Sequence, residues 1–114
     1  MSTNYTTFRG DDFKLDLTFQ TAAGVAIDIT GWIIFFTLKN DKEDADASAV
    51  IEKDISAHTD PTEGETQIAL TNLETYPLEG TYYYDIQYKR SNGEVHTVDD
   101  GTVMFKEDIT RRIV

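Results

Sequence analysis

The stretch LEGTYYYDIQYK, residues Leu78–Lys89, decides the fold of this chain. From Tyr82 to Tyr88, every second position holds a tyrosine or an isoleucine. Side chains two residues apart on a β-strand point to the same face, so this period predicts a strand with one buried face. A helix would instead repeat its apolar residues every three or four positions.

A second stretch, GWIIFFTLK at Gly31–Lys39, is apolar at both sets of alternating positions. We expect the even-numbered residues from Trp32 to Leu38 to face the core. Ile33 and Phe35 then lie on the opposite face of the same strand. Strands with two apolar faces are typical of segments covered on both sides.

The rest of the chain repeats this pattern in short segments separated by Gly, Asn, Asp or Pro clusters, as in antiparallel all-β domains. FKLDLTFQ (Phe13–Gln20) is the clearest half-buried strand, and VAIDITG (Val25–Gly31) is also expected to be one. Thr71–Glu74 matches a capping box and predicts one helical turn. Asn92–Gly93 predicts a tight hairpin turn. The last segment, Val95–Lys106, is expected to form a strand pair or one bulged strand kinked at Gly101.

These segments predict an all-β fold, an antiparallel β-sandwich of about seven or eight strands with one short helical turn. The expected core is Phe13, Leu15, Leu17, Ile27, Ile29, Trp32, Ile34, Phe36, Leu38, Ile51, Ile68, Leu70, Leu73, Tyr82, Tyr84, Ile86, Val103 and Phe105.

The composition fits one domain over residues 1–114, a length that can bury a core without metal or disulfide support. The chain has no cysteine, which excludes disulfides, thiolate metal sites and a cysteine nucleophile. Its net charge of −11, from 21 acidic and 10 basic residues, disfavours nucleic acid and anionic membranes as partners. The polar start MSTNYTTFRGDDF predicts no signal peptide, and no apolar run reaches the roughly 20 residues that span a bilayer.

The order of RGDDFKLDLTF, AIDITGWIIFFTLK, LEGTYYYDIQYK, an Asn-Gly turn and DDGTVMFKEDIT resembles the immunoglobulin-like (Ig-like) β-sandwich modules of tailed bacteriophages and prophages. That group includes the N-terminal domains of baseplate upper proteins. The resemblance implies a non-enzymatic virion structural protein of the tail or baseplate, without cofactor, made in the host cytoplasm. Its implied partners are other tail proteins or copies of itself.

Gly80 and Tyr82 also resemble the corner of an Ig-type sandwich, where a tyrosine hydroxyl bonds to backbone upstream. Tyr84 would then occupy the position of the second cysteine. In such a sandwich the Trp32 strand neighbours the Tyr82 strand, so Ile33 and Phe35 should lie near Tyr83 on the outer surface. We predict a contact patch there; alternatively, a segment of the same chain covers it, or the residues are singly exposed.

The segment DITRRIV is the second candidate contact element. Arg111 and Arg112 adjoin an apolar end, so the segment is either a frayed tail or a docking arm that finds acid on a neighbour.

Catalytic patterns are weak in this sequence. His58 and His96 lie in no hydrolase motif, and we interpret both as solvated or edge-strand histidines. Carboxylate pairs such as Asp11–Asp12 and Asp99–Asp100 are common in so acidic a chain and do not by themselves predict glycosidase chemistry.

Two binding alternatives stay open. Asp41, Glu43, Asp44 and Asp46 offer oxygen ligands for calcium, but an EF-hand starting at Asp44 would have Ala49 in place of glycine at its sixth position. A solvated acidic loop is favoured. The competing function is a glycan- or host-surface-binding module that stacks sugars on Tyr76, Tyr82, Tyr83, Tyr84 and Tyr88. The alternation turns Tyr82 and Tyr84 inward, which weakens that platform.

Overall fold

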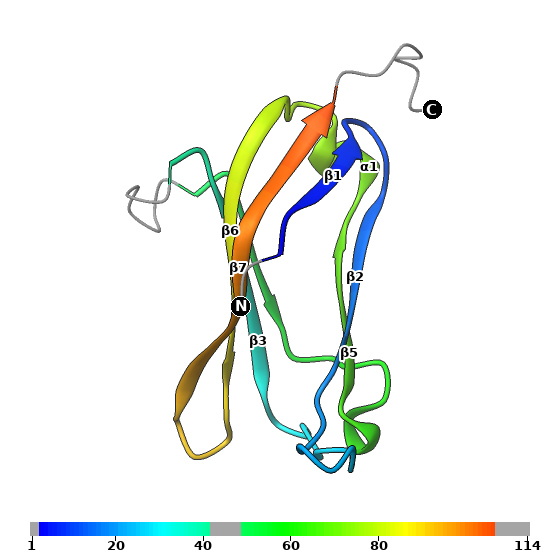
Figure 1. Cartoon of the computed structure of the whole chain (residues 1–114), viewed down its shortest axis with the longest axis vertical. Helices are drawn as coiled ribbons and strands as arrows, with labels where there is room; N and C mark the ends of the chain where they lie inside the picture. The colour runs from blue at the N-terminus through cyan, green and yellow to red at the C-terminus, as the bar shows by residue number, and fades with distance from the viewer. Residues whose placement is uncertain (1–2, 42–48, 107–114) are drawn as a thin grey trace.

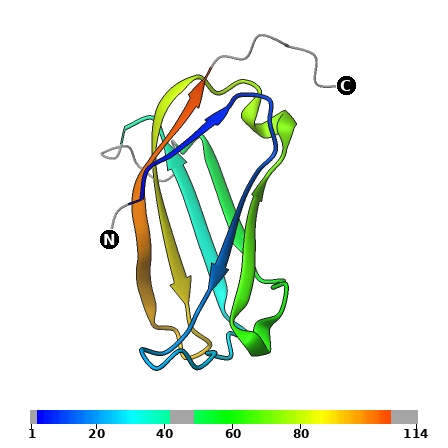
Figure 2. The same ribbon diagram turned by 45° about the vertical axis from the view of Figure 1, so that its right-hand side comes forward.

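The computed structural model describes residues 3–41 and 49–106, which form two β-sheets packed face to face (Figures 1 and 2). Its strands are β1 (Tyr5–Phe8), β2 (Phe13–Thr18), β3 (Ile33–Lys39), β4 (Ile51–Ile55), β5 (Glu65–Leu70), β6 (Gly80–Lys89) and β7 (Val95–Lys106). The larger sheet has the order β1-β7-β6-β3-β4, and the smaller sheet pairs β2 with β5. Neighbouring strands are antiparallel except β1 and β7, which are parallel. The predicted all-β, Ig-like sandwich is confirmed.

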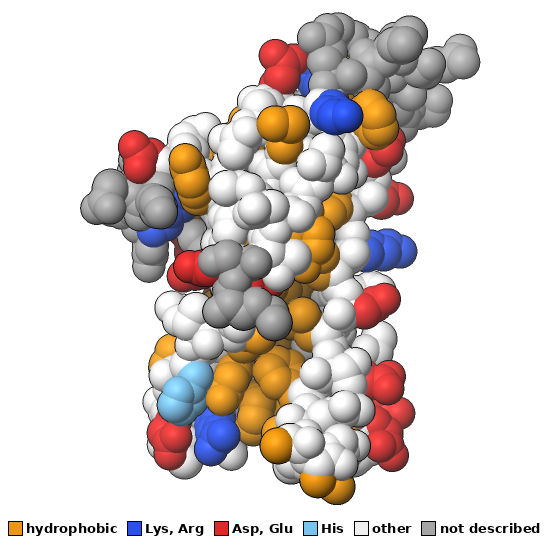
Figure 3. Space-filling model, in the orientation of Figure 1, with side chains coloured by type: hydrophobic (Ala, Val, Ile, Leu, Met, Phe, Trp, Pro, Cys, Tyr) orange, Lys and Arg blue, Asp and Glu red, His pale blue; other side chains and the backbone are white. Residues whose placement is uncertain are grey.

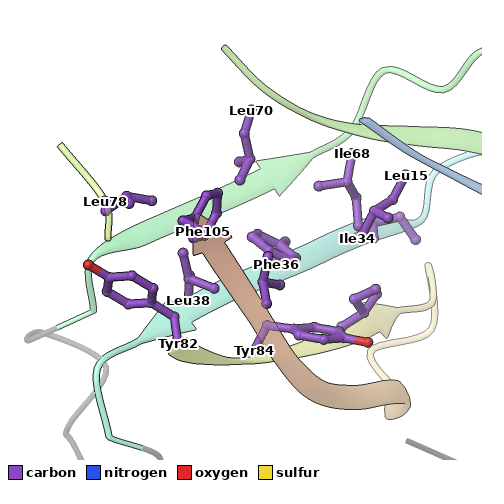
Figure 4. Packing of buried hydrophobic residues seen from close by; sticks show 12 residues of the cluster. Leu15, Ile34, Phe36, Leu38, Ile68, Leu70, Leu78, Tyr82, Tyr84 and Phe105 are labelled. Carbon is purple, nitrogen blue, oxygen red and sulfur yellow. The ribbon is translucent and has the colours of Figure 1, made fainter. Parts of the chain in front are cut away.

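The core lies between the sheets and is built from one face of each strand. Phe36 of β3 pairs with Ile86 of β6, and both side chains are buried. Leu15 of β2 and Ile68 of β5 meet them from the opposite sheet (Figure 4). The even-numbered positions of β3 therefore face inward, as the alternation predicts.

Most of the predicted core is buried, with one clear error. Leu73 is 67% exposed because it lies on the surface turn α1 (Asn72–Thr75), whereas Leu78, which was not predicted, is buried at 4%. Four further predicted core residues are only half-buried: Phe13, Leu17, Ile27 and Ile51.

The segment predicted as a strand at residues 25–31 does not form one. Its backbone amides bond instead to loops, Ile27 to the Phe19 carbonyl at 3.0 Å and Ile29 to the Pro61 carbonyl at 2.9 Å, beside the short 3₁₀ helix η2 (Pro61–Glu63). Ile29 is nevertheless fully buried, because the segment folds across one end of the sandwich.

The last segment is one strand, and its irregularity is not where the sequence indicated. The β6–β7 register shifts between Ile86 and Gln87, opposite Thr97 and Asp99, so the extra residue of the bulge is Val98. Gly101 is needed for another reason. A Cβ at Gly101 would overlap the carbonyl oxygen of Thr3, which precedes β1.

Both local motifs read from the sequence are present. The Glu79 amide donates to the Tyr82 hydroxyl at 3.2 Å, which is the corner bond expected of an Ig-type sandwich. At α1, the Glu74 amide donates to the Thr71 side chain and the Thr71 amide donates to the Glu74 carboxylate, completing the capping box. No helix in the described part of the chain is long and apolar enough to cross a membrane.

Tyr82→Phe should lower the free energy of unfolding by about 1–2 kcal/mol, because the Glu79 amide loses its acceptor while the ring stays in the core. Chemical denaturation of the two proteins measures the difference. Equal stability would show that the corner bond contributes nothing net.

Candidate functional site

The solvent side of the five-stranded sheet, called here the outer face, carries the second apolar side of β3. Ile33 and Phe35 are half-buried on it, between the buried Trp32, Ile34 and Phe36. A shallow hollow on the outer face is lined by Phe35, Thr37, Glu52, Asp54, Gln87, Lys89 and Val95. The outward placement of Ile33 and Phe35 therefore agrees with the alternation in the sequence.

Tyr83 does not lie beside these two residues. Phe35 pairs with Gln87 across the β3–β6 ladder, whereas Tyr83 pairs with Lys39. Four residues along a strand separate Phe35 from Lys39 by roughly 13 Å. The predicted single patch of Ile33, Phe35 and Tyr83 is wrong in this respect, because a period of two fixes the face of a strand but not its register.

Tyr83 belongs to a second hollow on the outer face, lined by Thr37, Lys39, Tyr83, Tyr84, Asp85, Asp100, Gly101 and Thr102. Farther along the same face, Phe8 and Met104 are 47% and 42% exposed. Apolar side chains are visible over the upper ends of β1 and β7 (Figure 3). Sequence reasoning missed this zone, since it treated residues 5–8 as a polar start and not as a strand.

Acid lines one side of the hollow at Phe35. Glu52 and Asp54 of β4 flank it on one side, and Lys89 of β6 lies on the other. Such a rim suits a partner that brings an apolar group with a cation on the β4 side and an acid on the β6 side, since complementary charge favours encounter and orientation.

The remaining predicted contact and metal residues fall mostly outside the described residues. The residues outside are Arg111, Arg112, Glu43, Asp44 and Asp46. Asp41 is described and exposed, two residues after the end of β3. No group of three or more His, Asp or Glu side chains is placed to hold a metal ion in residues 3–41 and 49–106. The calcium loop and the docking arm stay predictions.

Three of the five tyrosines considered for a sugar-stacking platform are held inside the molecule. Tyr82 and Tyr84 are buried, and Tyr88 stacks on Trp32 with ring centroids 4.7 Å apart. The Tyr84 hydroxyl lies 2.7 Å from the Thr3 carbonyl oxygen and 3.1 Å from the Asp99 carboxylate, so these two acceptors share its one proton. Burial, and then the Asp99 carboxylate, raise the pKa of this hydroxyl well above its ordinary value. These contacts are those of a structural residue.

His58 is not the solvated histidine that the sequence indicated. It is half-buried, with Nδ1 2.9 Å from the Thr66 hydroxyl and Nε2 2.8 Å from the Trp32 carbonyl oxygen. Because Thr66 lies on β5 and Trp32 directly precedes β3, the imidazole joins the two sheets. His96 is exposed, as expected, 3.2 Å from the Glu94 carboxylate.

Fold and surface together describe an Ig-like β-sandwich with apolar residues on the outer side of its larger sheet. No family model matches the chain, and the search of curated proteins found no match. Among solved structures it is similar to the fibronectin(III)-like modules of Clostridium thermocellum CbhA, at 10% identity and a TM-score of 0.49. The match covers 94% of this chain and 91% of that one. At this level of similarity the likeness supports no inference about function.

Proposed function

We propose that the protein is a non-enzymatic contact module of a tailed-phage or prophage virion, acting in the tail or baseplate. The observation that carries the contact role is the apolar outer side of β3, where Ile33 and Phe35 are half-buried on a strand whose other side fills the core. The resemblance of the sequence to phage β-sandwich modules supports the virion setting. The partners are other virion proteins or further copies of the chain.

The size of the surface suits an assembly that repeats it. Full burial of an isoleucine or phenylalanine side chain is worth roughly 1.5–3 kcal/mol, and part of that is already realised by the half-burial of Ile33 and Phe35. One such contact is weak. Symmetric assemblies repeat a weak contact many times, which makes the total strong.

The double substitution Ile33→Thr with Phe35→Thr should abolish or strongly weaken assembly while the monomer stays folded, because threonine keeps the strand but removes apolar surface. Light scattering at several protein concentrations measures the assembly state, and chemical denaturation measures monomer stability.

The matched control is Val25→Thr with Leu73→Thr, since both residues are more than 60% exposed and lie outside the outer face. Assembly should be unchanged in this control. If the outer-face variant assembles normally and loses only stability, Ile33 and Phe35 serve the interior of their own molecule, and the proposal fails.

A further inference from the structure

Strand β7 has a free edge over its first four residues, Val95–Val98. β1 pairs with β7 only at Val103–Lys106, and the Thr3 amide adds one bond to the Asp100 carbonyl. Along Val95–Val98, no strand among the described residues pairs on that side. Figure 2 shows β1 crossing only the upper part of β7. Such an edge presents unpaired backbone groups to an incoming strand.

The register identifies which backbone groups face outward at this edge. The Arg90 amide donates to the Glu94 carbonyl at 2.8 Å where the β6–β7 hairpin begins. Hydrogen-bonded and non-hydrogen-bonded pairs alternate along an antiparallel ladder, so His96 bonds to β6. Val95 and Thr97 therefore direct their amides and carbonyls away from β6, toward the free edge.

An aromatic slot, defined by Phe19, Trp32 and Tyr88, lies beside this edge. The Phe19 centroid is 5.6 Å from both of the other rings, and Trp32 stacks on Tyr88. Phe19 and Tyr88 are only partly buried where they pack against the core, as are Leu17 of β2 and Val98 of β7. Figure 3 shows apolar side chains in the furrow between β7 and β2, beside the two-stranded smaller sheet. The Arg90 guanidinium lies 5.4 Å from the Trp32 ring centroid and 5.8 Å from that of Tyr88, so an incoming strand meets this side chain at the slot.

We propose that residues 109–114 of one copy, ITRRIV, add to the free edge of β7 in another copy and cover its aromatic slot. Pairing at a sheet edge takes its affinity from main-chain bonds and its specificity from alternate side chains. Four of the six residues are β-branched, which suits a strand. The proposal rests on the self-assembly part of the proposed function and names a different surface for it.

The chain cannot supply this strand to itself. Thr97 precedes Lys106 by nine positions on the same strand, a span of roughly 30 Å. The eight residues 107–114 reach at most roughly 29 Å when fully extended, and β1 already occupies the intervening edge. Residues 109–114 therefore cannot pair with Val95–Val98 of their own molecule, and a second copy must bring them to this edge.

Charge favours this segment over other parts of the chain. Two copies with a net charge of −11 each repel one another, whereas the side chains of residues 107–114 sum to zero, because Arg111 and Arg112 balance Glu107 and Asp108. Asp99 is half-buried on β7 and pairs with Ile86, two residues before Tyr88 on β6. Glu94, at the hairpin end, is already paired with Arg90 at 3.8 Å. The ion pairs of the described residues do not include Asp99, so an arginine there would give it a charge-assisted bond.

Self-association of the full chain is the first test. Light scattering should show the apparent mass rising above 12.9 kDa with concentration. Deletion of residues 107–114, or Arg111→Glu with Arg112→Glu, should weaken association at least tenfold.

Thr97→Pro should also weaken association at least tenfold, because it removes an amide at the free edge of β7 but no bond to β6. Thr97→Ala is the control and should have no effect. Association unchanged by the deletion overturns the proposal.

The second test uses Trp32, the only tryptophan, as a reporter of the slot. A synthetic peptide of residues 107–114, added to the protein that lacks them, should lower acrylamide quenching of Trp32 at least twofold and saturably. The same peptide with both arginines replaced by glutamate should not. If the peptide leaves the quenching of Trp32 unchanged, the proposal is overturned. This test does not depend on whether Thr97→Pro folds.

The two proposals fail in different ways. If Ile33→Thr with Phe35→Thr abolishes assembly and the peptide has no effect, the contact at the outer face is supported and strand addition at the β7 edge is overturned. If that variant assembles normally and the peptide protects Trp32, the β7 edge stands and the outer face does not.

Discussion

Trp32→Ala is expected to lower the free energy of unfolding by about 3–5 kcal/mol, the range for truncating a large buried aromatic residue. The indole is 7% exposed, stacks on Tyr88 and meets the edge of Phe19. The Arg90 guanidinium also lies 5.4 Å from the ring centroid. Truncation would leave a cavity that these groups cannot fill without moving β6.

The measurement is chemical denaturation followed by far-ultraviolet circular dichroism, because the variant has no tryptophan fluorescence. Leu73→Ala is the control: its side chain is 67% exposed, so its stability should change by about 0.5 kcal/mol or less. A loss of stability below about 1 kcal/mol for Trp32→Ala would mean that the Trp32 side chain contributes little to the core.

The sequence predicted which side of each strand faces the core wherever a period of two extends over a long stretch. Ile34 and Ile86 are buried as the alternation required. Leu73 failed because it was assigned from hydrophobicity alone, although the capping box that contains it indicated a surface turn. Leu78 is buried instead, where its amide bonds to the Thr75 carbonyl at 3.0 Å just after α1.

Contacts between distant segments could not be predicted in the same way. Asn4 bonds to Thr102 across 98 positions, and the parallel pairing of β1 with β7 follows from contacts of this kind. No local pattern marks a four-residue strand with mixed polarity. For the same reason the outward placement of Ile33 and Phe35 was predicted, but the exposed pair Phe8 and Met104 was missed.

The glycines also show that contacts between distant segments cannot be predicted from local sequence. All seven adopt positive φ and are consistent with turns and irregular backbone, but the sequence does not distinguish those in open space from those in tight packing. Gly64 is buried where three segments cross. A Cβ there would overlap the carbonyl oxygen of Phe19 and lie 2.7 Å from that of Ile27. The Gly64 carbonyl also accepts a hydrogen bond from the Phe19 amide at 2.8 Å, which holds the two backbone segments close together.

Gly64→Ala should therefore lower the free energy of unfolding by about 2–5 kcal/mol. Left-handed backbone costs a residue with a Cβ roughly 1–2 kcal/mol, and forcing atoms into packed surroundings adds roughly 1–3 kcal/mol. Gly24→Ala separates these contributions, because Gly24 has a similar φ of 81° but no atom within 4 Å of the added Cβ. Gly24→Ala should cost only the conformational part, about 1–2 kcal/mol. Denaturation of the two variants side by side measures the difference, and equal losses would show that the crossing at Gly64 relaxes freely.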